Sequence, residues 1–513
     1  MSKSRTQRAI INTASLAFKE IIAFLCNFIL PRLILAQYGS AYNGLITSIT
    51  QFLNISSLLR LGIAGATRSS LYKALANNDE KGVSLVVNSA QNYLLRTGVV
   101  VGVYIILLSI LYPFFFGNGI SFIEIFIIVI ACGSTTLSQY IFGLTYSSLL
   151  EADQKYYVVS IFETITNILT TTLCCILILT GFKFHFVKLI CSLLWVLFPC
   201  FIYLFSKRKY KIDKKVGVDR TIIKNKNDAM AHSIANIFHE NVDVIALTIF
   251  CGPAIVSVFA IYKLVTTGLK QVLSVFTGSL EAPFGEMWAK NEKENVKKNL
   301  FFYEFCICSF IAIFFSVALS LFVPFVALYT SNVTDVNYIL PNYAFLVIIS
   351  ETIYCLRIPF QTLAQSAGHY KQTKKAAFFE AGLNVLVTFC LVWKFGLVGA
   401  VIGTMVANAF RTIYYCFYVS KNMIKHSFNQ IANRLLWFLL IFILVYALSR
   451  QINCYKGIDG WKDWVVCGVI DVLISFTLYL VFSFAFYPHD LSRVFSIITS
   501  KTLWKRKRHE KTN

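Results

Sequence analysis

Apolar runs long enough to cross a lipid bilayer recur along the whole chain. Crossing takes about 20 apolar residues in a helix, and the bilayer offers the backbone no hydrogen-bonding partners, so such a chain folds as a helical bundle. Only 14% of its 513 residues are charged, whereas soluble domains carry about 25%. We therefore predict an all-α polytopic membrane protein with about fourteen spans, near residues 9–35, 42–66, 93–116, 121–149, 157–180, 184–206, 229–251, 254–280, 299–328, 337–365, 375–394, 397–420, 432–449 and 463–487.

Two short patterns occur twice at nearly the same offset. The pattern Phe-Glu-x-x-x-Asn begins at Phe162 and again at Phe379, 217 positions later. The pattern Ala-x-Asn-(Asp/Glu) begins at Ala76 and again at Ala289, 213 positions later. Together they predict a duplicated unit of roughly 215 residues, and a duplicated helical bundle in a membrane is typical of alternating-access transport.

The longest polar stretch within the bundle divides the predicted repeat into two halves. Each half would hold six spans, so the halves would have the same orientation in the membrane, which is the parallel class of repeat. Two further spans have no counterpart. The predicted organisation is an N-terminal lobe over 1–206, a basic linker over 207–228, a C-terminal lobe over 229–420, two appended spans over 421–487 and a basic tail over 488–513.

The net charge of +22 follows the orientation of the spans. If the N-terminus is cytoplasmic, the loops on that side carry 33 Lys and Arg, and those on the other side carry 5. This bias places both termini in the cytoplasm and gives no support for nucleic-acid binding. The tail run Lys505–Arg508 is suited to anionic membrane lipid, although a simply solvated tail explains it almost as well.

Several cationic side chains fall at membrane depth. A charge at the centre of a span costs about 3 kcal/mol on insertion scales, so these side chains should face a wet or paired interior. Lys263 and Lys270 are seven residues apart and share one face of a predicted helix. We expect a cationic cavity formed by Lys19, Arg60, Lys263, Lys270, Arg357 and Arg411, with polar neighbours at Gln51, Asn54, Asn236 and Gln271.

Acidic side chains in the spans allow two interpretations. Glu20, Glu240 and Asp243 are deep enough to couple transport to H⁺ or Na⁺, but they could equally pair with lysines, for instance Glu240 with Lys263. The repeated Glu163 and Glu380 lie close to the start of their spans, where a helix N-terminus favours a carboxylate. We interpret this pair as structural or gate contacts at the same corner of each half.

The chain shows no arrangement typical of catalysis. It has no metal-ligand spacing, no glycine-rich phosphate loop and no pairing of a nucleophile with a base. We therefore predict a protein that is not an enzyme and holds no cofactor apart from a coupling H⁺ or Na⁺.

Three stretches resemble the bacterial polysaccharide repeat-unit (Wzx-type) flippases, which belong to the multidrug/oligosaccharidyl-lipid/polysaccharide exporter superfamily. The stretches are Gln37–Leu45, Leu61–Ala66 with Leu71–Ala76, and Phe395–Thr404, and the likeness covers most of residues 1–420. The resemblance implies two six-helix lobes arranged in a V, as in the multidrug exporters. The implied substrate is an undecaprenyl-pyrophosphate-linked oligosaccharide, moved to the outer leaflet of the bacterial inner membrane for O-antigen, lipopolysaccharide or capsule synthesis. The implied partners are membrane lipids and the polysaccharide polymerase machinery.

We expect Lys263 and Lys270 to hold the pyrophosphate while Glu240 and Asp243 couple its release to an ion. Three alternatives stay open. A lipid II flippase has a closely related substrate, and a drug/cation antiporter of the same fold would need an acidic cleft rather than a cationic one. A membrane glycosyltransferase, polymerase or ligase usually carries a large loop outside the membrane, whereas the largest outer loop predicted here is about a dozen residues, Arg450–Asp463.

Overall fold

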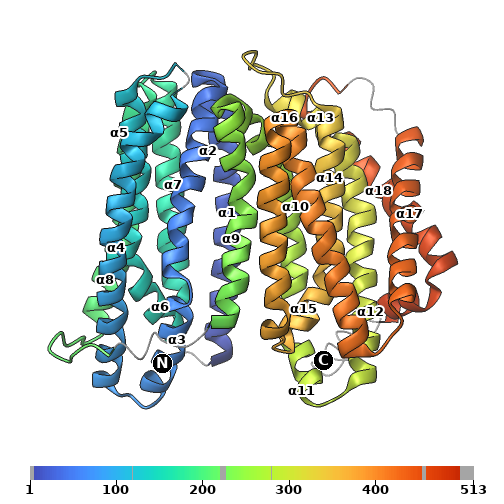
Figure 1. Cartoon of the computed structure of the whole chain (residues 1–513), viewed down its shortest axis with the longest axis horizontal. Helices are drawn as coiled ribbons and strands as arrows, with labels where there is room; N and C mark the ends of the chain where they lie inside the picture. The colour runs from blue at the N-terminus through green and yellow to red at the C-terminus, as the bar shows by residue number, and fades with distance from the viewer. Residues whose placement is uncertain (1–4, 118, 220–226, 279, 453–457, 497–513) are drawn as a thin grey trace, which may run out of the picture. The chain divides into compact units, whose positions relative to one another are not determined.

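The structure is a computed structural model that describes residues 5–117, 119–219, 227–278, 280–452 and 458–496 (Figure 1). The regular elements within these ranges are all helical. Twelve helical segments are long and apolar enough to cross a membrane, so the prediction of an all-α polytopic membrane protein is confirmed. The basic run Lys505–Arg508 and residues 220–226 of the predicted linker lie outside the described ranges.

The chain forms two compact units. Unit 1 comprises Met1–Leu264, Asn332–Asn337 and Ala377–Thr404, and unit 2 comprises Val265–Ser331, Tyr338–Ala376 and Met405–Asn513. These units do not share the boundaries of the predicted lobes, which stay a prediction. Two long helices contribute to both units, α10 (Pro253–Gly278) and α16 (Tyr370–Val419).

Unit 1 is built on long helices that pack side by side. Helix α1 packs on α7, α5 packs on α8, and the short α3 packs on α6. The buried apolar residues form two clusters, one around Leu45, Val101 and Ile125 and another around Leu71 and Leu149. Its elements are α1 (Arg5–Tyr38), α2 (Ser40–Asn54), η1 (Ile55–Arg60), α3 (Ile63–Ala76), α4 (Glu80–Phe116), α5 (Phe122–Ser138), η2 (Gln139–Gly143), α6 (Leu144–Ala152), α7 (Tyr156–Leu179), α8 (Phe184–Lys209) and α9 (Asn227–Cys251), with parts of α10 and α16.

Unit 2 contains the predicted appended spans, which pack on α13. The Glu304 side chain is buried in α12, and its Oε2 lies 3.0 Å from Nε of Arg434 in α17. The Arg434 guanidinium also reaches Asp490 at 2.9 Å and stacks over the rings of Phe301 and Phe438. The elements are α11 (Glu281–Ala289), α12 (Lys293–Phe310), η4 (Ile311–Phe315), α13 (Ser316–Tyr329), α14 (Pro341–Leu356), α15 (Ile358–Ser366), η5 (Ser420–Ile424), α17 (Phe428–Ile452) and α18 (Trp461–Phe486), with parts of α10 and α16.

The twelve membrane-length segments and the fourteen predicted spans differ in two places. The predicted spans 375–394 and 397–420 lie within one segment, Tyr370–Ile424, which reverses at Gly396 (φ 52°, ψ −128°). The predicted span 42–66 is broken because a 3₁₀ turn, η1, follows α2 and Gly62 then takes a left-handed conformation (φ 78°). Thirteen predicted spans therefore lie on membrane-length helices, and the fourteenth is the broken α2–α3 segment.

The predicted duplication is also present in the backbone. Residues with positive φ are rare outside glycine and mark special turns. Of the eleven such residues in the described ranges, eight form four pairs at offsets of 213 to 215 residues, which supports a repeat of about 215. The matching pairs are Gly39 with Gly252, Asn78 with Asn291, Gln154 with Gly368, and Gly181 with Gly396.

The Phe-Glu-x-x-x-Asn pattern is out of register with this backbone repeat. Helices α7 and α16 begin at Tyr156 and Tyr370, 214 residues apart, whereas Glu163 and Glu380 are 217 apart. The difference of three residues corresponds to about 4.5 Å along a helix, nearly one turn. Glu380 therefore lies about one turn further along α16 than Glu163 lies along α7, whereas the Ala-x-Asn-(Asp/Glu) pattern is in register.

Candidate functional site

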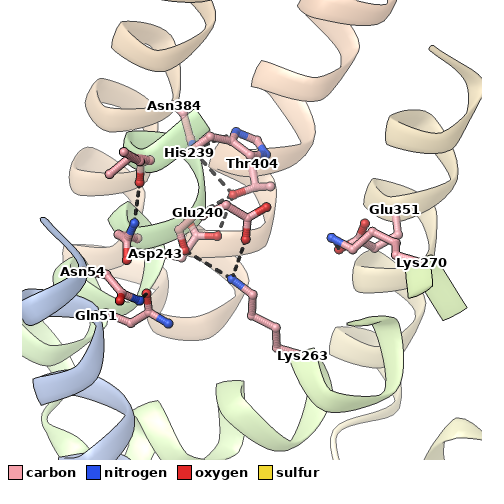
Figure 2. A network of polar contacts seen from close by, with 12 residues as sticks. Gln51, Asn54, His239, Glu240, Asp243, Lys263, Lys270, Glu351, Asn384 and Thr404 are labelled. Carbon is pink, nitrogen blue, oxygen red and sulfur yellow. Dashed lines mark hydrogen bonds and ion pairs between the residues drawn. The ribbon is translucent and has the colours of Figure 1, made fainter. Parts of the chain in front are cut away.

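A buried carboxylate in unit 1 is surrounded by hydroxyl and amide groups (Figure 2). Asp243 lies in α9 with 8% of its surface exposed. The Thr404 hydroxyl lies 2.9 Å from its Oδ1 and 2.7 Å from its Oδ2, and the Thr388 hydroxyl lies 3.5 Å from Oδ1. Thr388 also donates to Oδ1 of the fully buried Asn384 at 2.9 Å. We call these four residues, Asp243, Asn384, Thr388 and Thr404, the Asp243 cluster.

The reversal of α16 at Gly396 brings the Asp243 cluster together. Asn384 and Thr388 precede the reversal and Thr404 follows it, so the two limbs must pack closely. A Cβ on Gly399 would lie 2.3 Å from the backbone oxygen of Leu391, and one on Gly403 would lie 2.2 Å from the Thr388 hydroxyl. The absence of a side chain at Gly399 and Gly403 therefore allows the limbs to approach, and the residue after Gly403 is Thr404 of the cluster.

A lysine–glutamate pair lies beside the Asp243 cluster in Figure 2. Nζ of Lys263 in α10 lies 3.1 Å from Oε2 of Glu240 in α9 and 3.2 Å from the Glu240 backbone oxygen. The pair is partly accessible, because the side chains are 30% and 54% exposed. The pairing of Glu240 with Lys263 that the sequence left open is thus present. It joins an expected substrate-binding cation to an expected ion-coupling carboxylate.

A second ion-pair group in unit 1 joins α1 to α7. Nζ of Lys19 lies 3.1 Å from Glu20 and 3.4 Å from Glu163. The lysine side chain is only 13% exposed, so its charge is held between two carboxylates. Glu163, expected to be a structural or gate contact, is therefore a partner of an expected substrate-binding lysine.

Arg60 lies apart from these pairs at the end of η1. Its side chain is exposed and lines a cavity that also contains the start of α3. In α2, the Gln51 side chain accepts a hydrogen bond from Asn54 at 3.3 Å, and Figure 2 places both residues near the Asp243 cluster. Asn236 is exposed on α9, and Glu380 is buried in α16.

The remaining expected cations lie in unit 2. Nζ of Lys270 in α10 lies 3.2 Å from Glu351 in α14 and 5.1 Å from the centre of the Tyr354 ring. The buried Arg357 guanidinium stacks on the same ring at 4.4 Å. Lys270 and Arg357 therefore share one aromatic surface, while Gln271, next to Lys270, is exposed.

Arg411 is held within its own helix. Its side chain is buried at 3% exposure, its Nη2 donates to the Tyr415 hydroxyl at 3.2 Å, and its guanidinium stacks on the Tyr415 ring at 4.9 Å. One turn earlier, Asn408 donates to the Ser350 hydroxyl at 3.4 Å. Arg411 therefore belongs to a packed interface of α16 with α14.

No protein-family model matches the chain, and no curated protein matches it. Solved structures do match. A lipid II flippase MurJ in an inward closed conformation aligns with 92% of this chain and 99% of its own, at a TM-score of 0.67 and 13% identity. The chain has the fold of this structure. A multidrug resistance MATE family transporter of the MOP superfamily aligns with 83% of this chain in two conformations. The alignment with the inward-facing structure covers 99% of that structure's chain at a TM-score of 0.61. The alignment with the outward-facing structure covers 96% of its chain at a TM-score of 0.53, and both show 14% identity.

Proposed function

We propose that this protein is a flippase that moves an undecaprenyl-pyrophosphate-linked oligosaccharide repeat unit from the cytoplasmic to the outer leaflet by alternating access. The fold shared with a lipid II flippase supports this proposal. The observation that carries it is the Lys263–Glu240 pair, a 3.1 Å contact between partly exposed side chains within a membrane-length bundle. A pyrophosphate oxygen can replace the Glu240 carboxylate there, because an exposed ion pair is weak and phosphate is a strong acceptor for an ammonium group.

In this mechanism, substrate binding and ion binding favour each other through neighbouring groups. Pyrophosphate takes Lys263 from Glu240, and the freed carboxylate then lies beside Asp243 (Figure 2). A second negative charge at this place favours binding of a cation or a proton. The Asp243 cluster supplies carboxylate, hydroxyl and amide oxygens for Na⁺, or a carboxylate for H⁺. Binding of the coupling ion would thus favour the state in which Lys263 has given up its pair.

The other expected cations have separate roles in the proposal. Lys270 and Arg357, which share the Tyr354 ring, would contact the sugar or its phosphate, because aromatic rings and cations suit a glycosyl phosphate. Lys19, held by Glu20 and Glu163, would be a second exchangeable pair. Arg411 would contribute through packing of α16 rather than by direct contact.

The proposal places the protein in the cytoplasmic membrane of a bacterium with both termini in the cytoplasm. The prenyl chain would remain in lipid while the polar head crosses, so no bond is broken and the protein is not an enzyme. The product would then be available to the polymerase machinery of O-antigen or capsule synthesis.

Lipid II is the alternative substrate that a specific finding favours, because a lipid II flippase shares the fold over 92% of the chain. Both substrates carry an undecaprenyl pyrophosphate, so the Lys263–Glu240 pair would serve either. Complementation separates them. A lipid II flippase would restore growth when the host's own lipid II flippase is depleted, and a repeat-unit flippase would restore only surface polysaccharide.

Reconstitution tests the proposal directly. Purified protein in liposomes should move a fluorescent undecaprenyl-pyrophosphate oligosaccharide between leaflets, and a membrane-impermeant quencher would measure the transfer. Lys263→Gln with Lys270→Gln should abolish transfer while leaving incorporation into liposomes unchanged. Transfer at the wild-type rate by this double variant would rule out the assigned role of the two lysines.

A further inference from the structure

Unit 1 contains a cavity that is not part of the Asp243 cluster. Its volume is about 320 Å³, and it lies between the start of α3, α6 and Leu94 of α4. The polar side chains that line it are Arg60, Thr67, Arg68, Thr145 and Ser148. The proposed coupling and substrate groups around Lys263 do not line this cavity within the described part of the chain.

The start of α3 forms one wall of the cavity. Gly62, in a left-handed conformation at φ 78°, precedes this 14-residue helix, and no side chain caps its first turn. The first N–H groups of an α-helix have no partner within the helix, and they carry its positive dipole end. Residues 62–65 line the cavity, so these donors are available to an anion there.

Two hydroxyl groups in the cavity wall have unused hydrogen-bonding capacity. Thr67 and Thr145 are 1% and 2% exposed, and neither hydroxyl oxygen has a hydrogen-bond partner among the residues that the structure describes. Buried polar groups in native proteins are nearly always hydrogen-bonded to protein or to a bound molecule. The two threonines come from α3 and α6, so an acceptor lying between these helices could satisfy both.

The charge of the wall is positive. Arg68 pairs with Glu151 of α6, whereas Arg60 has no carboxylate within ion-pair distance in the described ranges. The wall therefore combines guanidinium groups, hydroxyls and helix N–H groups, which are the donors that phosphate oxygens accept best.

We propose that this cavity binds a phosphate group, either free or carried by a lipid headgroup. The group would lie against the first turn of α3, accept hydrogen bonds from Thr67 and Thr145, and pair with Arg60. The proposal rests on residues outside the Lys263 pair, and it gives Arg60, which was expected in the substrate cavity, a phosphate ligand of its own. Among the described residues nothing requires a glycine at position 65, since a Cβ there would meet no protein atom within 4 Å.

Filling the cavity tests the proposal. Gly65→Leu adds bulk without a backbone clash, and Gly102→Leu in α4 is the matched control, because a Cβ at Gly102 also meets nothing within 4 Å and Gly102 does not line the cavity. The probe is inorganic phosphate, titrated calorimetrically onto full-length protein in nanodiscs of zwitterionic lipid. We expect Gly65→Leu to weaken phosphate binding at least ten-fold and Gly102→Leu to leave it unchanged.

A second variant keeps the test decisive if Gly65→Leu fails to fold. Thr67→Val with Thr145→Val removes both hydroxyls while preserving side-chain shape, and it should also weaken phosphate binding at least ten-fold. A lipid arm distinguishes the source of the group. Nanodiscs containing phosphatidylglycerol should leave this lipid bound to wild-type protein in native mass spectrometry, and the double variant should lose it if the lipid headgroup is the occupant.

The outcomes are separable. Phosphate binding that depends on the two threonines supports a free anion, and threonine-dependent lipid retention supports a headgroup. Wild-type protein that binds neither probe, or a double variant that binds both as wild type does, overturns the proposal. Flipping of the labelled oligosaccharide, measured in parallel, reports independently on the Lys263 pair.

Discussion

The Thr404 hydroxyl lies within hydrogen-bonding distance of both carboxylate oxygens of Asp243, at 2.9 and 2.7 Å. Thr404 follows the reversal of α16, and Asp243 lies in α9, so the contact fixes the returning limb of α16 against a neighbouring helix. A carboxylate held in this way is oriented, and the Thr404 oxygen, while its hydrogen is donated to Asp243, still has a lone pair that can coordinate a cation.

Removing the Asp243 charge should uncouple transport from its ion. We expect Asp243→Asn to lose dependence of flipping on Na⁺ or on a proton gradient, because the amide cannot neutralise a cation. Thr404→Val should lower the apparent affinity for the coupling ion about ten-fold. This corresponds to about 1.4 kcal/mol, close to the contribution of one hydrogen bond to a charged group. Flipping rates in liposomes with imposed Na⁺ or pH gradients measure both. An unchanged gradient dependence in Asp243→Asn would exclude this residue as the coupling site.

The Lys263–Glu240 pair should tolerate exchange of its two residues but not loss of the lysine charge. Lys263→Gln should lower flipping about ten- to hundred-fold, because it removes a charge-assisted contact worth about 1.5–3 kcal/mol. The swapped variant Lys263→Glu with Glu240→Lys keeps a pair and should recover part of the activity. Equal rates for wild type and Lys263→Gln would contradict the proposed role.

The two limbs of α16 should tolerate no added methyl group at Gly399. Its Cβ would lie 2.3 Å from a backbone oxygen, so Gly399→Ala should destabilise the protein by about 1–3 kcal/mol, as overpacking does. Gly382→Ala in the same helix is the control, since its Cβ meets nothing within 4 Å. The control should gain about 0.5–1 kcal/mol from helix propensity. Thermal unfolding in detergent would show a lower midpoint for Gly399→Ala alone.

The buried Glu304–Arg434 pair should be important for stability. Glu304→Ala leaves the Arg434 charge without its 3.0 Å partner and should cost about 3–5 kcal/mol. Replacing all three charged residues of the group, with Glu304→Leu, Arg434→Met and Asp490→Asn, should be far less damaging because no charge is left unpaired. The exposed pair of Glu286 and Lys290 provides a control, and Glu286→Gln should not shift the unfolding midpoint measurably.

The turn before α16 should make stability depend on pH. Burial lowers the pKa of His369 below its usual value, and its Nδ1 contacts the Tyr418 hydroxyl at 2.8 Å. The unfolded chain therefore binds the His369 proton more readily than the folded protein does. The contribution of neutral His369 to the free energy of unfolding is complete above the unfolded pKa of about 6.5 and is lost as the pH falls below it. His369→Gln should flatten the dependence of the unfolding midpoint on pH between 7.5 and 5.5, and an unchanged dependence would contradict this role of His369.

Much of the fold could be predicted because apolar run length alone identifies spans. The two departures have local causes. Only residues 395 and 396 separate the predicted spans 375–394 and 397–420. Two residues are too few for a loop, so the two limbs form one segment that reverses at Gly396. The composition of the predicted span 42–66 gave no sign of the break at the left-handed Gly62.

The candidate site was less accessible to sequence reasoning. Depth and charge identified Lys263, Glu240 and Asp243 correctly as polar residues of the bundle, and the structure brings them together. Thr388, Thr404 and Glu351 were missed, because hydroxyls are common in spans and Glu351 lies in a run without other signals. Tertiary contacts across 161 residues, such as Thr404 with Asp243, leave no trace in local periodicity.

The reversal at Gly396 also affects the direction in which the following helices cross the membrane. Every crossing changes the side of the membrane on which the chain emerges, and this single residue adds one crossing without any loop. A substitution that straightened α16 would remove one crossing, and α17 and α18 would then have to cross the membrane in the opposite direction. The direction in which α17 and α18 run is thus tied to the backbone conformation of one glycine, Gly396 (φ 52°).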